Sequence, residues 1–146
     1  YEGLPWFTAA AAMSGALPAA ESIALALLYS AGAHGIMTLN DFKAIEGDRI
    51  MNVRSLPVQL GANGAARLAC LVMALPQVVV IVLLTLWRQP VEAGIVFLVL
   101  ALQLLLMIRF LRDPIRYAVW FSGFGVSLYV LGMLASAFAA RNVLIS

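Results

Sequence analysis

The sequence predicts an all-α fold, a polytopic bundle of about five transmembrane helices in a single domain over residues 1–146. Hydrophobic residues make up 64% of the 146 residues and charged residues only 11%, whereas a soluble domain carries roughly 25% charged residues. This composition excludes an ordinary soluble globule, a disordered chain and a nucleic-acid-binding module. The single cysteine excludes a disulfide scaffold and a cysteine-based zinc site. We therefore expect an integral membrane protein surrounded by lipid.

A helix needs about 20 mostly apolar residues to cross the hydrocarbon layer. The first run that satisfies this rule, residues 4–20, is rich in alanine and interrupted by Pro5 and Pro18. Residues 22–40 follow Glu21 and form the second run. The chain starts without an initiator Met or a basic leader, so we expect further residues upstream.

The remaining runs are also bounded by charges. Residues 66–87 lie mostly between Arg67 and Arg88, residues 91–111 have an uncharged centre over 93–108, and residues 117–140 follow Arg116. A polar, acidic loop is expected over residues 41–65. The sequence thus predicts five spans and one substantial loop.

The basic residues indicate the orientation, because cytoplasmic loops retain Lys and Arg. The two loops that follow the second and fourth spans contain seven of the nine basic residues. These are Lys43, Arg49, Arg54, Arg67, Arg109, Arg112 and Arg116. Only Arg88 and Arg141 lie on the other side. The acidic loop is therefore expected on the cytoplasmic side of the membrane.

The acidic loop begins with a dense group of charges, Asp41, Lys43, Glu46, Asp48 and Arg49. In a continuous helix, Asp41 and Asp48 share a face because they are seven residues apart. Carboxylate oxygens suit Mg²⁺, which usually binds through one or two carboxylates together with substrate phosphates. Neighbouring basic groups would take up the remaining phosphate charge. The pattern favours a magnesium-bridged diphosphate and the ionisation of an allylic diphosphate.

A solvated loop whose charges only fix the topology is the alternative interpretation, since short mixed-charge loops are common. The loop continues past Arg54 into an apolar, proline-containing stretch, residues 56–60. This stretch is typical of a packed cap over a cavity and favours a binding site.

His34 is the only histidine and lies within the second span, seven residues before Asp41. An ionisable group inside the membrane is a functional candidate: a neutral imidazole can ligate the magnesium of a chlorin or bind a substrate carboxylate. A structural hydrogen bond to a neighbouring helix explains it equally well. Arg112, near the end of the fourth span, is a second candidate pigment contact, although positive-inside charge also accounts for it.

Several segments resemble the UbiA-type intramembrane prenyltransferases, and within them the chlorophyll and bacteriochlorophyll synthases. Residues 40–49 and 54–58 are similar to the second aspartate-rich motif of the superfamily, and the likeness extends over essentially the whole chain. The segments that carry it are NDFKAIEGDR at 40–49, RSLPV at 54–58, HGI at 34–36, FLRDP at 110–114 and LYVLGML at 128–134.

The resemblance implies a nine-helix bundle, of which the five spans match the last five. It implies esterification of a (bacterio)chlorophyllide propionate with a geranylgeranyl or phytyl group donated by its diphosphate. The pigment carboxylate is then the nucleophile, so no catalytic protein nucleophile is expected. The implied ligands of the Mg²⁺–diphosphate are Asp41, Glu46 and Asp48, with Lys43, Arg49 and Arg54 assisting.

The first acidic motif of the family is missing from this sequence. We therefore expect residues 1–146 alone to be inactive, and expect catalysis to require further helices in the same or another polypeptide. A catalytically silent subunit of a photosynthetic pigment–protein complex is the alternative function. Half of a transporter is less favoured, because few polar residues lie at mid-membrane outside the second span.

Overall fold

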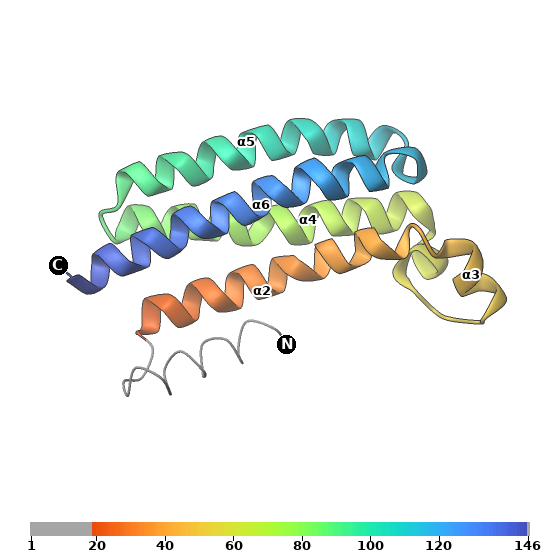
Figure 1. Ribbon diagram of the computed structural model, residues 1–146, viewed down its shortest axis with the longest axis horizontal. Coiled ribbons are helices and arrows are strands. Elements are labelled where there is room, and N and C mark those ends of the chain that lie inside the picture. The colour runs from red at the N-terminus through yellow and green to blue at the C-terminus, as the bar shows by residue number, and fades with distance from the viewer. Residues whose placement is uncertain (1–18, 146) are drawn as a thin grey trace.

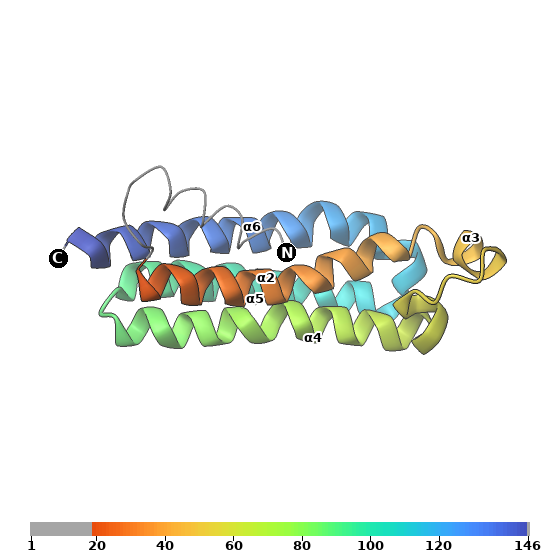
Figure 2. The same ribbon diagram turned by 90° about the horizontal axis from the view of Figure 1, so that it is seen from below.

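The computed structural model describes residues 19–145, with side chains described for residues 19–140. Four long helices run side by side, and a short helix, α3, projects from one end of the bundle (Figures 1 and 2). In chain order the helices are α2 (Ala20–Asp41), α3 (Ile45–Ile50), α4 (Leu56–Leu86), α5 (Pro90–Arg112) and α6 (Pro114–Ile145). The predicted all-α polytopic bundle is confirmed. The expected first span, residues 4–20, falls almost entirely outside the described residues.

Each of the four long helices is long and apolar enough to cross a membrane. The shortest, α2, has 22 residues and so rises about 33 Å, against a hydrocarbon layer roughly 30 Å thick. Large apolar side chains such as Leu27, Leu71, Phe97 and Phe138 are exposed on the outside of the bundle, as expected where lipid replaces water. The chain is an integral membrane protein.

Prolines and tight turns set the boundaries of the later helices. α5 and α6 begin at Pro90 and Pro114, a position where the missing N–H of proline is tolerated. Asp113 alone separates α5 from α6, and its Oδ1 accepts the backbone N–H of Arg116 at 3.2 Å. Arg88, with φ of 57°, turns the chain between α4 and α5. These short connections make consecutive helices antiparallel neighbours.

The acidic loop is shorter than the predicted 41–65. Asp41 is the last residue of α2, α3 occupies part of the loop, and α4 begins at Leu56 rather than near residue 66. Pro57 lies in the first turn of α4, where its fixed φ favours helix initiation. Arg67 is exposed on this helix and does not interrupt it. Within α4 the backbone leaves helical geometry at Gly61, with φ of 71° and ψ of 163°, a conformation open to glycine.

Small residues let α2 approach its neighbours. A Cβ atom at Gly35 would lie 2.6 Å from the Ala69 carbonyl oxygen on α4, and one at Gly32 would lie 2.0 Å from the Tyr129 hydroxyl on α6. Such close contacts are typical of helix association in membranes, where small residues bring the backbones together. Gly35 brings α2 close to α4 beside the candidate site, and Gly32 brings α2 close to α6.

The centre of the bundle contains polar side chains that bond across helices. Tyr29 on α2 and Ser136 on α6 are 2.8 Å apart, hydroxyl to hydroxyl, and the Tyr129 hydroxyl donates to the Tyr29 carbonyl oxygen at 2.8 Å. Gln77 on α4 donates through Nε2 to Oε1 of Gln103 on α5 at 2.8 Å. These bonds connect α2 with α6 and α4 with α5.

Candidate functional site

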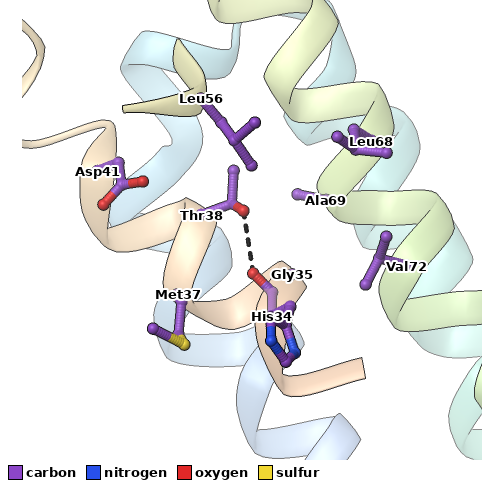
Figure 3. A pocket seen from close by; sticks show the side chains of 9 residues that line it. All are labelled: His34, Gly35, Met37, Thr38, Asp41, Leu56, Leu68, Ala69 and Val72. Atoms are coloured by element: carbon purple, nitrogen blue, oxygen red, sulfur yellow. Dashed lines mark hydrogen bonds between the residues drawn. The ribbon is translucent and has the colours of Figure 1, made fainter. Parts of the chain in front are cut away.

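A pocket of about 380 Å³ lies between α2 and α4, near the end of the bundle that carries α3 (Figure 3). α2 contributes His34, Gly35, Met37, Thr38 and Asp41 to its lining. The opposite wall is apolar and comes from α4, through Leu56, Leu68, Ala69 and Val72. The pocket is therefore largely apolar, and its polar side chains all come from α2.

His34 and Asp41 are the two predicted site residues that line this pocket. They are seven residues apart on the same helix, so the predicted common face of residues 34 and 41 is present. Figure 3 shows them on the α2 side of the pocket, with the Asp41 carboxylate towards the Leu56 end. The pocket thus has an acidic end and an imidazole further along the helix.

The hydrogen bond of His34 determines which ring nitrogen is free. Nδ1 lies 3.1 Å from the Ser30 carbonyl oxygen, and because a carbonyl oxygen only accepts, Nδ1 carries the proton and donates. In the neutral ring the Nε2 lone pair then remains available. Thr38 donates to the His34 carbonyl oxygen at 2.9 Å, so its hydroxyl is used within the helix.

Asp48 lies on α3, not on a continuation of α2. The expectation of one helical stripe through residues 34, 41 and 48 is therefore wrong, because the chain turns at residues 42–44 between the two helices. The turn nevertheless brings Asp48 near enough to Asp41 for their two charges to interact. Asp41 therefore lies at the acidic end of the pocket, whereas Asp48 is on the adjoining α3 and does not line the pocket.

The other predicted ligands of the diphosphate lie in the α3 segment and are exposed. Glu46 is on α3 with Asp48, and the basic side chains of Lys43, Arg49 and Arg54 surround the same segment. Among residues 19–140, no three His, Cys, Asp or Glu side chains are arranged to enclose a metal ion. Of the three predicted acids, Asp41 therefore lines the pocket, and Glu46 and Asp48 lie on the adjoining α3.

Arg112 lies elsewhere, at the exposed last turn of α5. It is at the same end of the bundle as α3 (Figure 1), but it does not line the α2–α4 pocket. The structure thus separates the two candidate pigment contacts, with His34 in the pocket and Arg112 outside it.

The sequence did not indicate the α4 wall of the pocket. Leu68, Ala69 and Val72 belong to an apolar run that resembles any other membrane span, and nothing in their types marks a binding surface. Gly35 was the available signal, since a small residue beside a lone histidine indicates a close helix contact there.

A comparison with protein-family models shows the family of the chain. The model of the UbiA prenyltransferase family matches residues 3–126, most of the chain. The chain belongs to the UbiA prenyltransferase family. The predicted resemblance is thereby confirmed, and within the UbiA family the similar proteins are pigment synthases.

Three curated UbiA-type relatives illustrate this. The bacteriochlorophyll synthase 33 kDa chain of Cereibacter sphaeroides is 57% identical over 98% of this chain and 47% of its own length. The 34 kDa chain of Chloroflexus aurantiacus is 50% identical over 94% of this chain and 44% of its own length. The chloroplastic chlorophyll synthase of Arabidopsis thaliana is 31% identical over 97% of this chain and 36% of its own. The chain therefore spans half or less of these relatives, and no solved structure matches it.

Proposed function

We propose that this chain forms the diphosphate-binding side of a prenyltransferase site that completes a chlorophyll-type pigment. In this proposal a geranylgeranyl or phytyl group passes from its diphosphate to the propionate of a chlorophyllide or bacteriochlorophyllide. The observation that carries the proposal is the position of Asp41 at one end of an apolar pocket, directly before the charged segment that contains α3. The similarity to proteins named as bacteriochlorophyll and chlorophyll synthases supports the choice of pigment.

The side chains at the pocket suit Mg²⁺. This ion is usually held by one or two carboxylates and completes its shell with water and substrate phosphates. We assign Asp41 and Asp48 as its ligands, with Glu46 on α3 as a third carboxylate close by. A site that the diphosphate completes requires no closed cage of protein ligands.

The basic residues of the α3 segment supply the remaining charge compensation. Lys43, Arg49 and Arg54 are exposed around the two aspartates, and arginine forms paired hydrogen bonds to phosphate oxygens. We assign all three to the diphosphate. Their exposure allows a charged donor to bind from the water side.

In the transfer, the bond between the allylic carbon and the diphosphate oxygen breaks, and its electron pair leaves with the diphosphate. A pigment carboxylate oxygen forms the new carbon–oxygen bond. Bound Mg²⁺ would neutralise charge that develops on the diphosphate. The apolar side chains of Leu56, Leu68 and Val72 exclude water from the electron-poor allylic carbon, so that the carboxylate is the nucleophile.

His34 is proposed as a pigment contact through its free Nε2, either on the chlorin magnesium or on a hydroxyl donor. The pocket volume of about 380 Å³ is near the lower end of the range for ligand pockets, roughly 300–1,000 Å³. It accommodates part of a prenyl chain or pigment but not both substrates. Arg112 and helices outside these residues are therefore proposed to complete the site, and residues 1–146 alone are expected to be inactive.

The first prediction tests the two aspartates in the full-length protein. Asp41→Ala and Asp48→Ala each remove one metal ligand, so esterification of chlorophyllide should fall by about 100-fold or more. The measurement is the magnesium-dependent formation of the prenylated pigment in membranes, compared with unaltered protein at equal membrane abundance.

Glu21→Gln is the matched control, because it neutralises an acid at the opposite end of the same helix. It should leave the esterification rate unchanged. Wild-type turnover by the Asp41→Ala/Asp48→Ala double variant would contradict the metal site, whereas the absence of turnover by the unaltered full-length protein would favour the silent subunit. Membership of the UbiA family already favours prenyl transfer over transport.

A further inference from the structure

Three arginines surround the turn between α5 and α6, at the same end of the bundle as α3 (Figure 1). Arg109, Arg112 and Arg116 are all exposed. The only acid in this turn, Asp113, uses its Oδ1 to accept the backbone N–H of Arg116. Within the described part of the chain, no carboxylate forms an ion pair with these guanidinium groups. The turn therefore concentrates three positive charges around a single carboxylate, Asp113, and keeps a net positive charge.

Aromatic rings hold two of these guanidinium groups in place. Cζ of Arg109 lies 5.0 Å from the ring centroid of Tyr117 and 5.1 Å from that of Trp120. Cζ of Arg116 lies 5.6 Å from the centroid of the same Tyr117 ring. A guanidinium packed on ring faces retains the N–H donors at its edge for an anion. We call Arg109, Arg116, Tyr117 and Trp120 the α5–α6 arginine patch.

The patch lies at the turn that joins two helices long and apolar enough to cross a membrane. α5 ends at Arg112 and α6 starts at Pro114, so a bilayer crossed by both helices would place its headgroups near this turn. Tyr and Trp prefer this interfacial depth. The patch also differs from the α2–α4 pocket, because none of its residues lines that pocket.

We propose that the α5–α6 arginine patch binds the phosphate headgroup of an anionic phospholipid. The ordered guanidinium groups supply charge and hydrogen-bond donors, and the two rings supply the apolar surface on which the glycerol and upper acyl chains rest. The patch selects lipids with a net negative headgroup over zwitterionic ones, because only the former balance the excess positive charge of the turn.

The test uses the full-length protein in detergent, titrated with phosphatidylglycerol or phosphatidylcholine and analysed by native mass spectrometry. Phosphatidylglycerol should be retained preferentially. The Arg109→Gln/Arg116→Gln variant should bind it on the order of tenfold more weakly, and raising the salt concentration should reduce the preference of the unaltered protein. Trp120→Leu keeps both charges but removes one ring, so it should weaken binding to an intermediate degree.

Arg67→Gln is the matched control, since Arg67 is an exposed arginine on a membrane helix and touches no ring among the described side chains. It should retain wild-type affinity. Equal retention of the two lipids, or an equal loss in Arg67→Gln, would overturn the proposal. Displacement of phosphatidylglycerol by micromolar diphosphate would instead assign the patch to the prenyl donor. Circular dichroism of each variant checks that the helices remain folded.

Discussion

At the scale of single residues, one stretch of α2 contains both a candidate binding residue, His34, and the glycine that packs against α4, Gly35. Gly35 lines the candidate pocket and also permits the close contact with Ala69 on α4. His34, its neighbour in sequence, is exposed to the pocket with Nδ1 committed to Ser30. The glycine thus fixes how far α4 lies from the imidazole, so the width of the pocket depends on a residue without a side chain.

This close contact yields the second prediction. Gly35→Ala places a Cβ 2.5 Å from Met73 Cγ and 2.6 Å from the Ala69 carbonyl oxygen, so α2 and α4 must move apart. The expected loss in the free energy of unfolding is about 1–3 kcal/mol. Gly94→Ala on α5 is the control, because nothing lies within 4 Å of the position that its new Cβ would take.

At Gly94 the gain in helix propensity should leave stability unchanged or raise it by up to about 1 kcal/mol. Unfolding by a denaturing detergent in mixed micelles measures both variants. An unaffected Gly35→Ala protein would contradict the tight α2–α4 contact.

At the scale of helices, a hydrogen bond between two buried glutamine side chains links α4 and α5 inside the core. Gln77 Nε2 donates to Gln103 Oε1 and also to the Met73 carbonyl oxygen at 3.1 Å. Pro76 lies directly before Gln77 in α4 and supplies no backbone N–H, which leaves the Val72 carbonyl without its usual helical donor. Oε1 of Gln77 and Nε2 of Gln103 have no hydrogen-bond partner among the described residues, so the pair is only half satisfied.

The third prediction follows from this incomplete bonding. Gln103→Leu alone removes the acceptor used by Gln77 and should lower the free energy of unfolding by about 1–2 kcal/mol. Gln77→Leu/Gln103→Leu replaces both partners with apolar groups and should cost less than the sum of the two single changes. A double-mutant cycle in micelles measures the coupling, expected at roughly 0.6–1.7 kcal/mol. Strict additivity would show that the two amides do not interact.

The sequence predicted the helices better than their ends. Long uncharged runs located four described spans, because crossing the bilayer demands about 20 apolar residues. The start of α4 was missed, since Arg67 suggested a boundary although one exposed arginine is tolerated on the helix surface. Because the helix was expected to start near Arg67, residues 56–65 were assigned to the loop. In the structure α4 begins at Leu56, with Pro57 in its first turn.

For the site, the acidic residues were evident from their types, but their arrangement was not. Asp41 and Asp48 were expected to share a face of one helix, but the chain turns after α2 and places Asp48 on α3. The turn at residues 42–44 has no glycine or proline to signal it. The apolar pocket wall from α4 required the tertiary structure, since helix packing brings Leu68 and Val72 opposite His34.

At the scale of the whole molecule, charge is distributed unequally between the two ends of the bundle. The end with α3 and the α5–α6 turn contains the acids of the candidate site and most of the basic residues, whereas the turn between α4 and α5 contains Arg88. We propose, from the positive-inside rule, that the α3 end faces the cytoplasm.

The fourth prediction tests this orientation with single introduced cysteines. Ala44→Cys lies beside α3, and Pro90→Cys lies at the opposite end of the bundle; both positions are exposed. In intact cells a membrane-impermeant maleimide should label Pro90→Cys and should label Ala44→Cys only after lysis. The native Cys70 is buried and serves as the unlabelled background. The reverse labelling pattern would place the acids on the outer side.

The backbone at Gly61, with its positive φ, divides α4 into a short first piece, residues 56–60, and a long second piece, residues 62–86. The second piece contains Met73 and Gln77, which are buried in the core. The first piece follows the segment that contains α3. A Cβ added at Gly61 would meet nothing within 4 Å, so the constraint at this position is the positive φ and not a lack of space. A side chain of any size at residue 61 should therefore strain the connection between the two pieces of α4, although there is room to accommodate it.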